Sequence, residues 1–449
     1  MNVQSVSRQV EGMREQQERS SMRVFFFIWV GQLVSILGTN LTGYALGVWL
    51  YQQTGAVTNY GLSLLFQTLP ALLLSSVAGV LVDKQDRRQV MILSDLAAGL
   101  GTLTIALLLF AGRLEVWHIY LFNAYSSVLS TFQRPAYTAS ITLLVPKEQF
   151  GRASGMVQMG EAIGQIVGPA LAGILLVAIG LPGLVFIDVF TAIFAVTTLL
   201  FVTIPRPPAS ETSEEAGVSF LEQVTFGWRY ILARSGLLGL LVVYAVVNFA
   251  LGGFSALLMP FLLSLVGPQK VGLIVSASSV GLLLGGVLMS AWGGPQGKRI
   301  HYVLAFLLLL GAILALIGLT TTPLTITALL FAMMLCVPVI QACSQPIWQS
   351  KVPADVQGRV FAARSVIAMA AMPLAYVTAG PLVDHLFNPL LAPGGALAET
   401  FLGQLIGVGS DRGIGLMFMI VGAICFLGVI SGYLNPHVRN VEEELPDAA

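Results

Sequence analysis

The sequence predicts an all-α polytopic membrane protein with twelve transmembrane helices in two pseudo-symmetric six-helix halves. Three observations predict this fold: an apolar composition, a regular succession of apolar segments, and a repeat at a fixed offset. Hydrophobic residues make up 56% of the 449 residues and charged residues only 10%, whereas soluble domains carry roughly 25% charged residues. Basic and acidic residues are equal in number, at 22 each, so net charge gives no reason to expect a nucleic acid as partner.

The apolar segments are long enough to cross a bilayer, which takes about 20 helical residues. Six of them precede residue 205, at 24–50, 60–82, 89–111, 116–137, 154–179 and 183–204. Six more follow residue 235, at 236–266, 271–292, 301–319, 323–345, 360–386 and 413–434. Each half of the chain is therefore expected to form one bundle, at 23–204 and at 236–434.

Polar segments separate and flank these two bundles. Residues 1–22 show no short apolar core with a cleavage site, so we expect a cytoplasmic segment rather than a signal peptide. Residues 205–217 predict a linker, and 218–235 place apolar groups at helical spacing, as in an amphipathic helix lying on the membrane surface. The tail, 435–449, contains a run of three glutamates and is expected to be disordered. The loop 387–412 is too irregular to assign.

Two motifs recur with an offset of 207 residues. Gly79 to Arg88 is echoed from Gly286 to Gly294, and Pro146 to Arg152 is echoed from Pro353 to Arg359. Two matches at one offset, with six spans on each side of a linker, indicate a duplication. Transporters built from such repeats bind their substrate between the repeats near the bilayer midplane.

The basic residues predict the orientation, because cytoplasmic loops carry the excess of Lys and Arg. With the N-terminus inside, the outer loops contain only three of the 22 basic residues, Arg113, Lys270 and Arg412. We therefore expect both termini in the cytoplasm of a cell with a bacterial-type inner membrane, and a protein that acts as a monomer.

Residues 79–88 resemble the loop between helices 2 and 3 of the major facilitator superfamily, Gly-x-Leu-x-Asp-Arg-x-Gly-Arg-Lys. The matching positions are Gly79, Leu81, Asp83, Lys84, Arg87 and Arg88, while Asp86 stands where the family usually has glycine. The second copy lacks the acid and ends in Trp292, Gly293, Gly294 and Pro295. That ending is similar to the branch that holds macrolide-efflux and siderophore-export permeases.

The fifth span resembles the helix-5 motif of drug–proton antiporters, Gly-x-x-x-Gly-Pro-x-x-Gly-Gly. It is carried by Gly164, Gly168, Pro169 and Gly173, with Ala172 in place of one glycine. Small residues four apart let two helix backbones approach closely, and a proline can kink the helix. The alternative is generic packing of membrane helices.

Two carboxyl groups inside the spans, Glu161 and Asp188, are candidates for proton coupling. Charges there cost about 2.5–3.5 kcal/mol at a helix centre on insertion scales. Desolvation favours the protonated form of a carboxyl group, which suits a group that takes up and releases a proton. Glu161 could instead pair with a cytoplasmic arginine, and Asp188 could have a structural role near a helix N-terminus.

A second group of charges is expected to form a gate on the cytoplasmic side. The resemblance implies that Arg134 and Arg364 bind Asp83 or Glu148, and that Asp83 also faces the start of the eleventh helix. Asp95 lies within two turns of the loop and is expected to join its ionic network. The complete set is Gly79, Asp83, Arg87, Arg88, Asp95, Arg134, Glu148 and Arg364.

A few polar and aromatic side chains inside the spans are candidates for lining a substrate cavity. A few polar groups among many apolar ones suit an amphipathic substrate. For each residue the alternative is an interhelical hydrogen bond or a place in the core. The candidates are Gln32, Asn40, Phe66, Gln67, Asn123, Tyr125, Gln158, Asn248 and Trp348.

These features favour a secondary active exporter of a drug, macrolide or siderophore-like compound by proton antiport, rather than an enzyme. A lysophospholipid flippase on the same fold is the alternative. The three cysteines lack metal-ligand spacing, and the four histidines are scattered, so the sequence predicts no metal site, cofactor or catalytic centre. A phosphate-binding loop ending in Gly-Lys-Ser/Thr is absent from the sequence as well.

Overall fold

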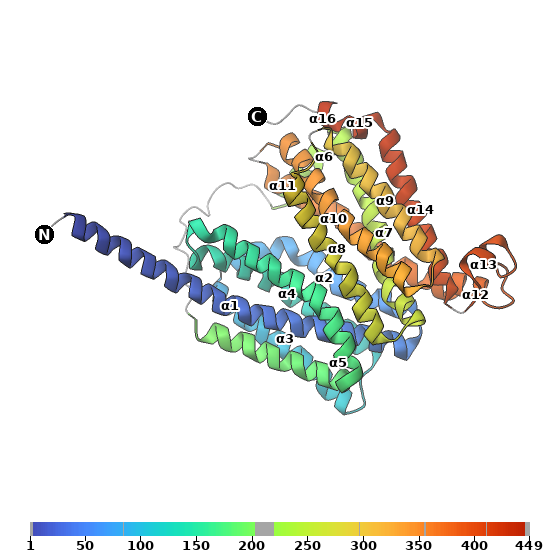
Figure 1. The fold of residues 1–449 in the computed structure, drawn as a ribbon, viewed down its shortest axis with the longest axis horizontal. Helices are drawn as coiled ribbons and strands as arrows, with labels where there is room; N and C mark the ends of the chain where they lie inside the picture. The colour runs from blue at the N-terminus through green and yellow to red at the C-terminus, as the bar shows by residue number, and fades with distance from the viewer. Residues whose placement is uncertain are drawn as a thin grey trace. The chain divides into compact units, whose positions relative to one another are not determined.

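The computed structural model describes residues 3–83, 85–202, 220–295, 297–353, 356–409 and 411–444. Side chains are described from Met22 onward, except at Ser76, Val80, Asp83 and 220–225. The regular secondary structure in these ranges is helical (Figure 1).

The first half of the chain forms five long helices. These are α1 (Val3–Thr54), α2 (Val57–Asp83), α3 (Arg87–Phe110), α4 (Val116–Leu144) and α5 (Phe150–Leu200), with a short turn, η1 (Lys147–Gln149), before α5. α5 consists of two arms, because Gly180 has a φ of 71° and breaks the helix there. Pro182 follows two residues later, so spans five and six meet in a tight turn.

The second half begins with α6 (Phe220–Leu232), in the segment where the sequence predicts an amphipathic helix. Five long helices follow: α7 (Ser235–Leu265), α8 (Pro268–Trp292), α9 (Arg299–Leu319), α10 (Pro323–Lys351) and α11 (Gln357–Leu382). A π-helical turn, η2 (Val383–Phe387), leads into α12 (Asn388–Leu391) and α13 (Phe401–Ile406), and the last span is α14 (Arg412–Leu434). The loop that the sequence left unassigned thus contains two short helices.

Ten helical segments among the described residues are long and apolar enough to cross a membrane. One of them, Lys147–Leu200, has 54 residues and holds two spans joined at Gly180. α4 has 29 residues, also enough to span, but contains too many polar groups to be counted among the ten. The protein is therefore a polytopic membrane protein, and these helices account for the twelve spans predicted from the sequence.

The chain divides into two compact units. The first comprises Met1–Leu46 and Phe66–Ser213, and the second Gly47–Leu65 and Glu214–Ala449. In the first unit α3 packs against α4 and α5, and in the second α14 packs against α9, α10 against α8, and α11 against α7. The second unit thus takes in one end of α1 and the start of α2, which belong to the first half of the sequence.

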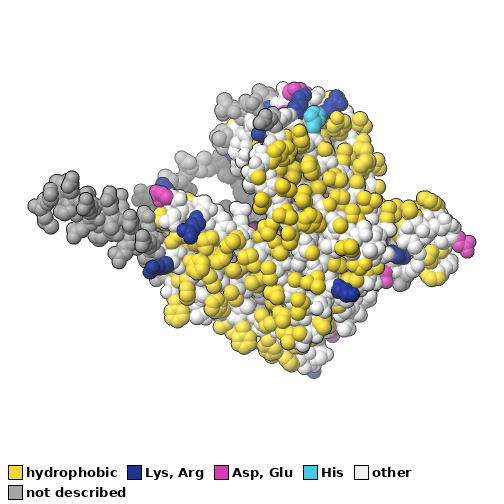
Figure 2. Space-filling model, in the orientation of Figure 1, with side chains coloured by type: hydrophobic (Ala, Val, Ile, Leu, Met, Phe, Trp, Pro, Cys, Tyr) yellow, Lys and Arg dark blue, Asp and Glu magenta, His cyan; other side chains and the backbone are white. Residues whose placement is uncertain are grey.

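The surface of the helices is apolar. Large hydrophobic side chains such as Leu93, Phe190 and Leu427 are more than 60% exposed. Figure 2 shows hydrophobic side chains spread over the helix flanks, while charged side chains gather near helix ends. Lipid tails can solvate such flanks, because the backbone polar groups along the length of a helix are paired within the helix.

Residues 436–439 and 441–444 of the acidic tail are helical, so the predicted disorder was wrong for them. They form two short helices, α15 (Pro436–Arg439) and α16 (Val441–Glu444), with Val438 and Val441 buried. The Glu442 carboxylate accepts a hydrogen bond of 2.9 Å from the Ile300 amide at the start of α9. The Lys351 ammonium donates to the Glu442 carbonyl at 2.6 Å, and Lys298 pairs with Glu443 at 2.9 Å. Glu442 therefore binds the start of α9, while Glu443 pairs with Lys298 at the exposed surface.

Removing the Glu442 side chain is expected to destabilise the second unit. The residue before α9 is Lys298, whose side chain cannot accept a hydrogen bond, so Glu442 acts as the missing cap. We expect Glu442→Ala to cost about 1 kcal/mol of stability, a typical value for a lost helix cap. Thermal unfolding in detergent measures the effect, with Glu399→Ala, at an exposed loop position, as the control. Equal midpoints for the two variants would contradict the capping role.

Candidate functional site

A cavity of about 530 Å³ lies within the first unit, between α1, α2, α4 and α5. Five of the side chains that the sequence singled out line it: Gln32 and Asn40 from α1, Gln67 from α2, Arg134 from α4 and Glu161 from α5. Further polar groups on its wall come from Ser35, Thr39, Ser130, Gln133, Tyr137, Thr138 and Gln165. Apolar groups, including Trp29, Leu33, Ile36 and Val157, complete the lining. The wall can therefore bind both polar and apolar parts of a ligand.

One charged pair stands on this wall. The Arg134 guanidinium lies 2.8 Å from a carboxylate oxygen of Glu161, and the two side chains are 76% and 39% exposed. An exposed pair contributes only about 0–1 kcal/mol to stability. Breaking the Arg134–Glu161 pair therefore costs the protein little stability. Pairing with an arginine was the alternative role that the sequence allowed for Glu161. In the structure Arg134 is that partner.

A second carboxyl group, Asp95, lies one layer behind the wall. It is 3% exposed and accepts hydrogen bonds from two glutamine amides that line the cavity, Gln32 at 2.9 Å and Gln133. Gln133 also donates to the Gln32 carbonyl oxygen at 3.2 Å. Among the described residues no cation lies within salt-bridge distance of Asp95. Asp95 thus belongs to an amide network at the cavity, and a ligand that moves either glutamine changes its surroundings.

Asp188 is a second buried carboxyl group among the described residues of this unit. It lies in the second arm of α5, is 4% exposed, and accepts a hydrogen bond of 3.0 Å from the Thr102 hydroxyl. α1 passes close by, since a Cβ on Gly38 would lie 2.8 Å from an Asp188 oxygen. The helix break is at Gly180, so Asp188 is two turns beyond the start of its arm, where the helix dipole no longer acts strongly. A capping role therefore does not explain this acid.

The glycines of the antiporter-like motif fix the approach of α5 to α1. A Cβ on Gly164 would lie 2.7 Å from the Asn40 amide nitrogen and 2.9 Å from Ile36, and a Cβ on Gly168 would lie 3.2 Å from the Asn40 Cβ. About two turns earlier in α5, the Trp29 indole donates a hydrogen bond of 2.7 Å to the Met156 carbonyl. Gly164, Gly168 and Gly173 are all buried. Small residues at this spacing let the two helices touch backbone to side chain, which positions Asn40 on the cavity wall.

The charged loop after α2 is anchored within the first unit. Arg87 donates to the Ala139 carbonyl at 2.8 Å, and Arg88 donates to the Leu199 and Leu200 carbonyls at 3.0 Å each. Both arginines thus satisfy carbonyls near the ends of α4 and α5. Asp86, which replaces the family's glycine, caps α3 by accepting from the Arg88 amide at 3.0 Å. The side chain of Asp83 and the whole of Lys84 lie outside the described residues.

The remaining candidates are not among the residues that line this cavity. Phe66 stacks on Tyr120, Tyr125 donates to the Ala97 carbonyl, and Gln158 is exposed. Asn123 is half-buried, and Glu148 is exposed in η1. In the second unit Asn248 donates to the Tyr244 carbonyl, and Trp348 is fully buried. There the Arg364 guanidinium lies 4.6 Å from the centre of the Trp348 ring and donates to Gln345 at 3.3 Å.

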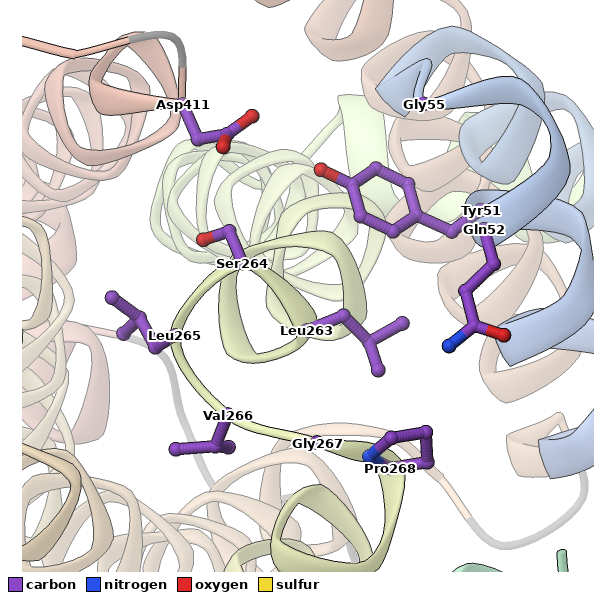
Figure 3. A pocket seen from close by; sticks show the side chains of 10 residues that line it. All are labelled: Tyr51, Gln52, Gly55, Leu263, Ser264, Leu265, Val266, Gly267, Pro268 and Asp411. Atoms are coloured by element: carbon purple, nitrogen blue, oxygen red, sulfur yellow. The ribbon is translucent and has the colours of Figure 1, made fainter. Parts of the chain in front are cut away.

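A second cavity, of about 550 Å³, lies within the second unit, between the end of α1 and the turn from α7 to α8 (Figure 3). Tyr51 points its hydroxyl toward Asp411 there, and residues 263–268 form the opposite wall. It holds one carboxyl group and no basic side chain. The first cavity brings together two charges of opposite sign and five side-chain amides, so it is the candidate functional site.

Sequence reasoning missed several residues of this site, and two of them, Gln133 and Gln165, carry side-chain amides. Gln133 directly precedes Arg134 in the fourth span, and Gln165 follows Gly164 in the motif. Both are uncharged polar residues in the middle of a span, and that was the available signal. The sequence also assigned Asp95 to the loop, because a distance along the chain does not reveal which face of the helix a side chain occupies.

Comparisons with known proteins match one transporter family and several exporters. The sequence model of the Major Facilitator Superfamily matches residues 28–376. A macrolide efflux protein A of Streptococcus pyogenes is 28% identical over 366 residues, covering 81% of this chain and 90% of that protein. An enterobactin exporter of Shigella flexneri is 25% identical over 227 residues, covering 50% and 53%.

Solved structures share the fold. A bacterial homologue of the human lysosomal transporter Spinster, in an inward-facing and unoccupied conformation, superposes with a TM-score of 0.68. The alignment covers 92% of this chain and 97% of that one, with 15% sequence identity. At this identity the likeness describes the fold alone.

Proposed function

Because the chain belongs to the Major Facilitator Superfamily and is thus a transport protein rather than an enzyme, we propose that it exports an amphipathic small molecule by proton antiport through alternating access. One observation carries the proposal: the cavity of the first unit joins an exposed Arg134–Glu161 pair, a wall of amides, and a buried acid behind two of those amides. A substrate and a proton can compete for such a site.

The lining supports a substrate with both polar and apolar parts. Its volume, about 530 Å³, lies within the range of small-molecule sites, roughly 300–1,000 Å³. Amides and hydroxyls can bind the polar groups of a ligand, while Trp29, Leu33 and Ile36 offer apolar contact. Macrolides and siderophores are such compounds, and the similar proteins named above act on them. We therefore place macrolides and siderophore-like compounds first among candidate substrates.

Two acids of the first unit, Glu161 and Asp188, are the candidates for proton coupling. Asp188 is buried and accepts a hydrogen bond from the Thr102 hydroxyl, a neutral partner. Glu161 faces the cavity and loses its ionic partner if a substrate occupies Arg134. In the proposed cycle Glu161 or Asp188 takes up the proton that replaces the substrate.

The orientation and the gate complete the proposal. We propose that both termini lie in the cytoplasm, on the basis of the basic residues, and that the protein acts as a monomer in a bacterial-type inner membrane. The loop 79–88 then forms the cytoplasmic gate, with Asp83 as its central acid. We expect Arg134 and Arg364 to bind Asp83 or Glu148, and for Arg134 this requires giving up its contact with Glu161.

An efflux screen tests the proposal. Inverted membrane vesicles containing the protein are supplied with macrolides, siderophores and lysophospholipids, with and without a protonophore. We expect accumulation of a macrolide or siderophore that the protonophore abolishes. Movement of lysophospholipid that is insensitive to the protonophore would overturn the proposal in favour of a lipid flippase.

A further inference from the structure

One acid of the second unit, Asp384, binds the start of a helix that lies far from it in the sequence. The carboxylate of Asp384, in η2, accepts hydrogen bonds from the Val57 amide at 3.0 Å, the Thr58 amide at 2.7 Å and the Thr58 hydroxyl at 2.6 Å. Val57 and Thr58 are the first two residues of α2. Asp384 therefore caps α2 across more than 320 positions of sequence.

α2 has no side chain of its own at this position. The residue before it is Ala56, which has no acceptor, and Thr54 accepts a hydrogen bond from the Ala56 amide at 3.3 Å. Helices usually satisfy their first amides with a Ser, Thr, Asp or Asn at the N-cap. Because α2 begins without one, its first turn depends on the carboxylate from η2.

Beside this contact, α2 and α11 also approach each other closely enough for their backbones to touch. A Cβ on Gly61 would lie 2.6 Å from the Tyr376 carbonyl oxygen, and a Cβ on Gly380 would lie 2.7 Å from the Thr58 amide nitrogen. Tyr376, Gly380 and Asp384 follow one another at intervals of four residues along α11 and into η2, so they share a face. The glycines thus bring α2 close enough for the Asp384 carboxylate to reach its amides.

We propose that Asp384 is a latch that holds the start of α2 against α11 in this conformation and releases it when transport proceeds. α2 belongs to the first sequence repeat and α11 to the second. Under alternating access the two repeats separate first on one side and then on the other. A contact made of one charged side chain and two glycines can break and form again, because water can bind the α2 amides that the carboxylate releases. The π-helical turn that carries Asp384 is of a kind often found at functional sites.

Labelling of a buried cysteine tests the latch. The three native cysteines are replaced by alanine, and Ala256→Cys is introduced in α7. Ala256 is fully buried, and its Cβ is 3.9 Å from the position that a Cβ on Gly61 would occupy. The rate of reaction with a maleimide is measured on the purified protein in detergent. We expect Asp384→Ala to increase the rate about fivefold, because the population of the released state rises.

Three further variants make the test specific. Asp411→Asn removes another carboxylate of the same unit and is expected to leave the labelling rate unchanged. Asp384→Asn keeps the side-chain volume and should give an intermediate rate, which provides a measurement if the alanine variant does not fold. Ala56→Asp combined with Asp384→Ala gives α2 a cap of its own. If Asp384 is a latch, this double variant still reacts fast.

Two results would overturn the proposal. One is an unchanged labelling rate in both Asp384 variants. The other is a return to the parent rate in the double variant, since Asp384 would then be a helix cap and nothing more. The proposal rests on alternating-access transport, but the labelling assay needs no substrate. Its failure can therefore be distinguished from failure of the export assay.

Discussion

Replacing Asp188 with asparagine is expected to reduce proton-driven export by about tenfold or more, because acids buried in a membrane transporter commonly carry the coupled proton. The amide keeps the shape of the side chain and can still accept the hydrogen bond from Thr102. It cannot bind or release a proton. Glu161→Gln should uncouple export in the same way, while the protein remains folded.

The measurement is substrate export in inverted vesicles, with and without an imposed proton gradient. Glu115→Gln is the matched control, because Glu115 is an exposed carboxyl group at the start of α4 and lies outside the cavity. We expect the control to retain normal export. If both Asp188→Asn and Glu161→Gln showed wild-type, proton-dependent export, neither acid would carry the proton.

Substituting Gly164 by valine is expected to separate α5 from α1 and to abolish export. A side chain at this position would meet Asn40 and Ile36 at less than 3 Å. Overpacking of this kind costs about 1–3 kcal/mol, and here it would also displace Asn40 from the cavity wall. Both thermal stability and export should therefore fall.

Gly155→Val is the control for this substitution. Gly155 lies nine residues earlier in α5, and a Cβ there would meet no other residue within 4 Å. The two variants make the same chemical change in the same helix, and only the contact with α1 differs. Equal stability and export for the two valine variants would show that the glycine motif does not set the helix spacing.

The spans were predictable because each depends on a local property of the chain. Runs of about 20 apolar residues identify a membrane helix whatever its neighbours are, and the turn at Gly180 lies in the gap between the predicted fifth and sixth spans. The acidic tail was not predictable in this way. A run of glutamates reads as a solvated segment until the helix starts and cations that it binds, at Ile300, Lys298 and Lys351, are known.

The site was predictable only in part, for a related reason. Polar residues inside spans are detectable one by one, and Gln32, Asn40, Gln67, Arg134 and Glu161 meet at one cavity. Tyr125 and Asn248 carry the same signal, yet they donate to backbone carbonyls of α3 and α7. Whether such a residue lines the cavity or binds a backbone carbonyl depends on the face of the helix that it occupies. Asp384 shows the limit most clearly, because its partners Val57 and Thr58 are in the other repeat.

The most direct test of the proposed antiport uses the purified protein in liposomes with an imposed pH gradient. The concentration of a macrolide on the side of the membrane to which it is transported is measured together with the pH inside the liposomes. We predict that the macrolide moves against its concentration gradient while protons move the opposite way, and that Asp188→Asn or Glu161→Gln removes this coupling. Macrolide movement that leaves the internal pH unchanged and ignores the gradient would contradict proton antiport.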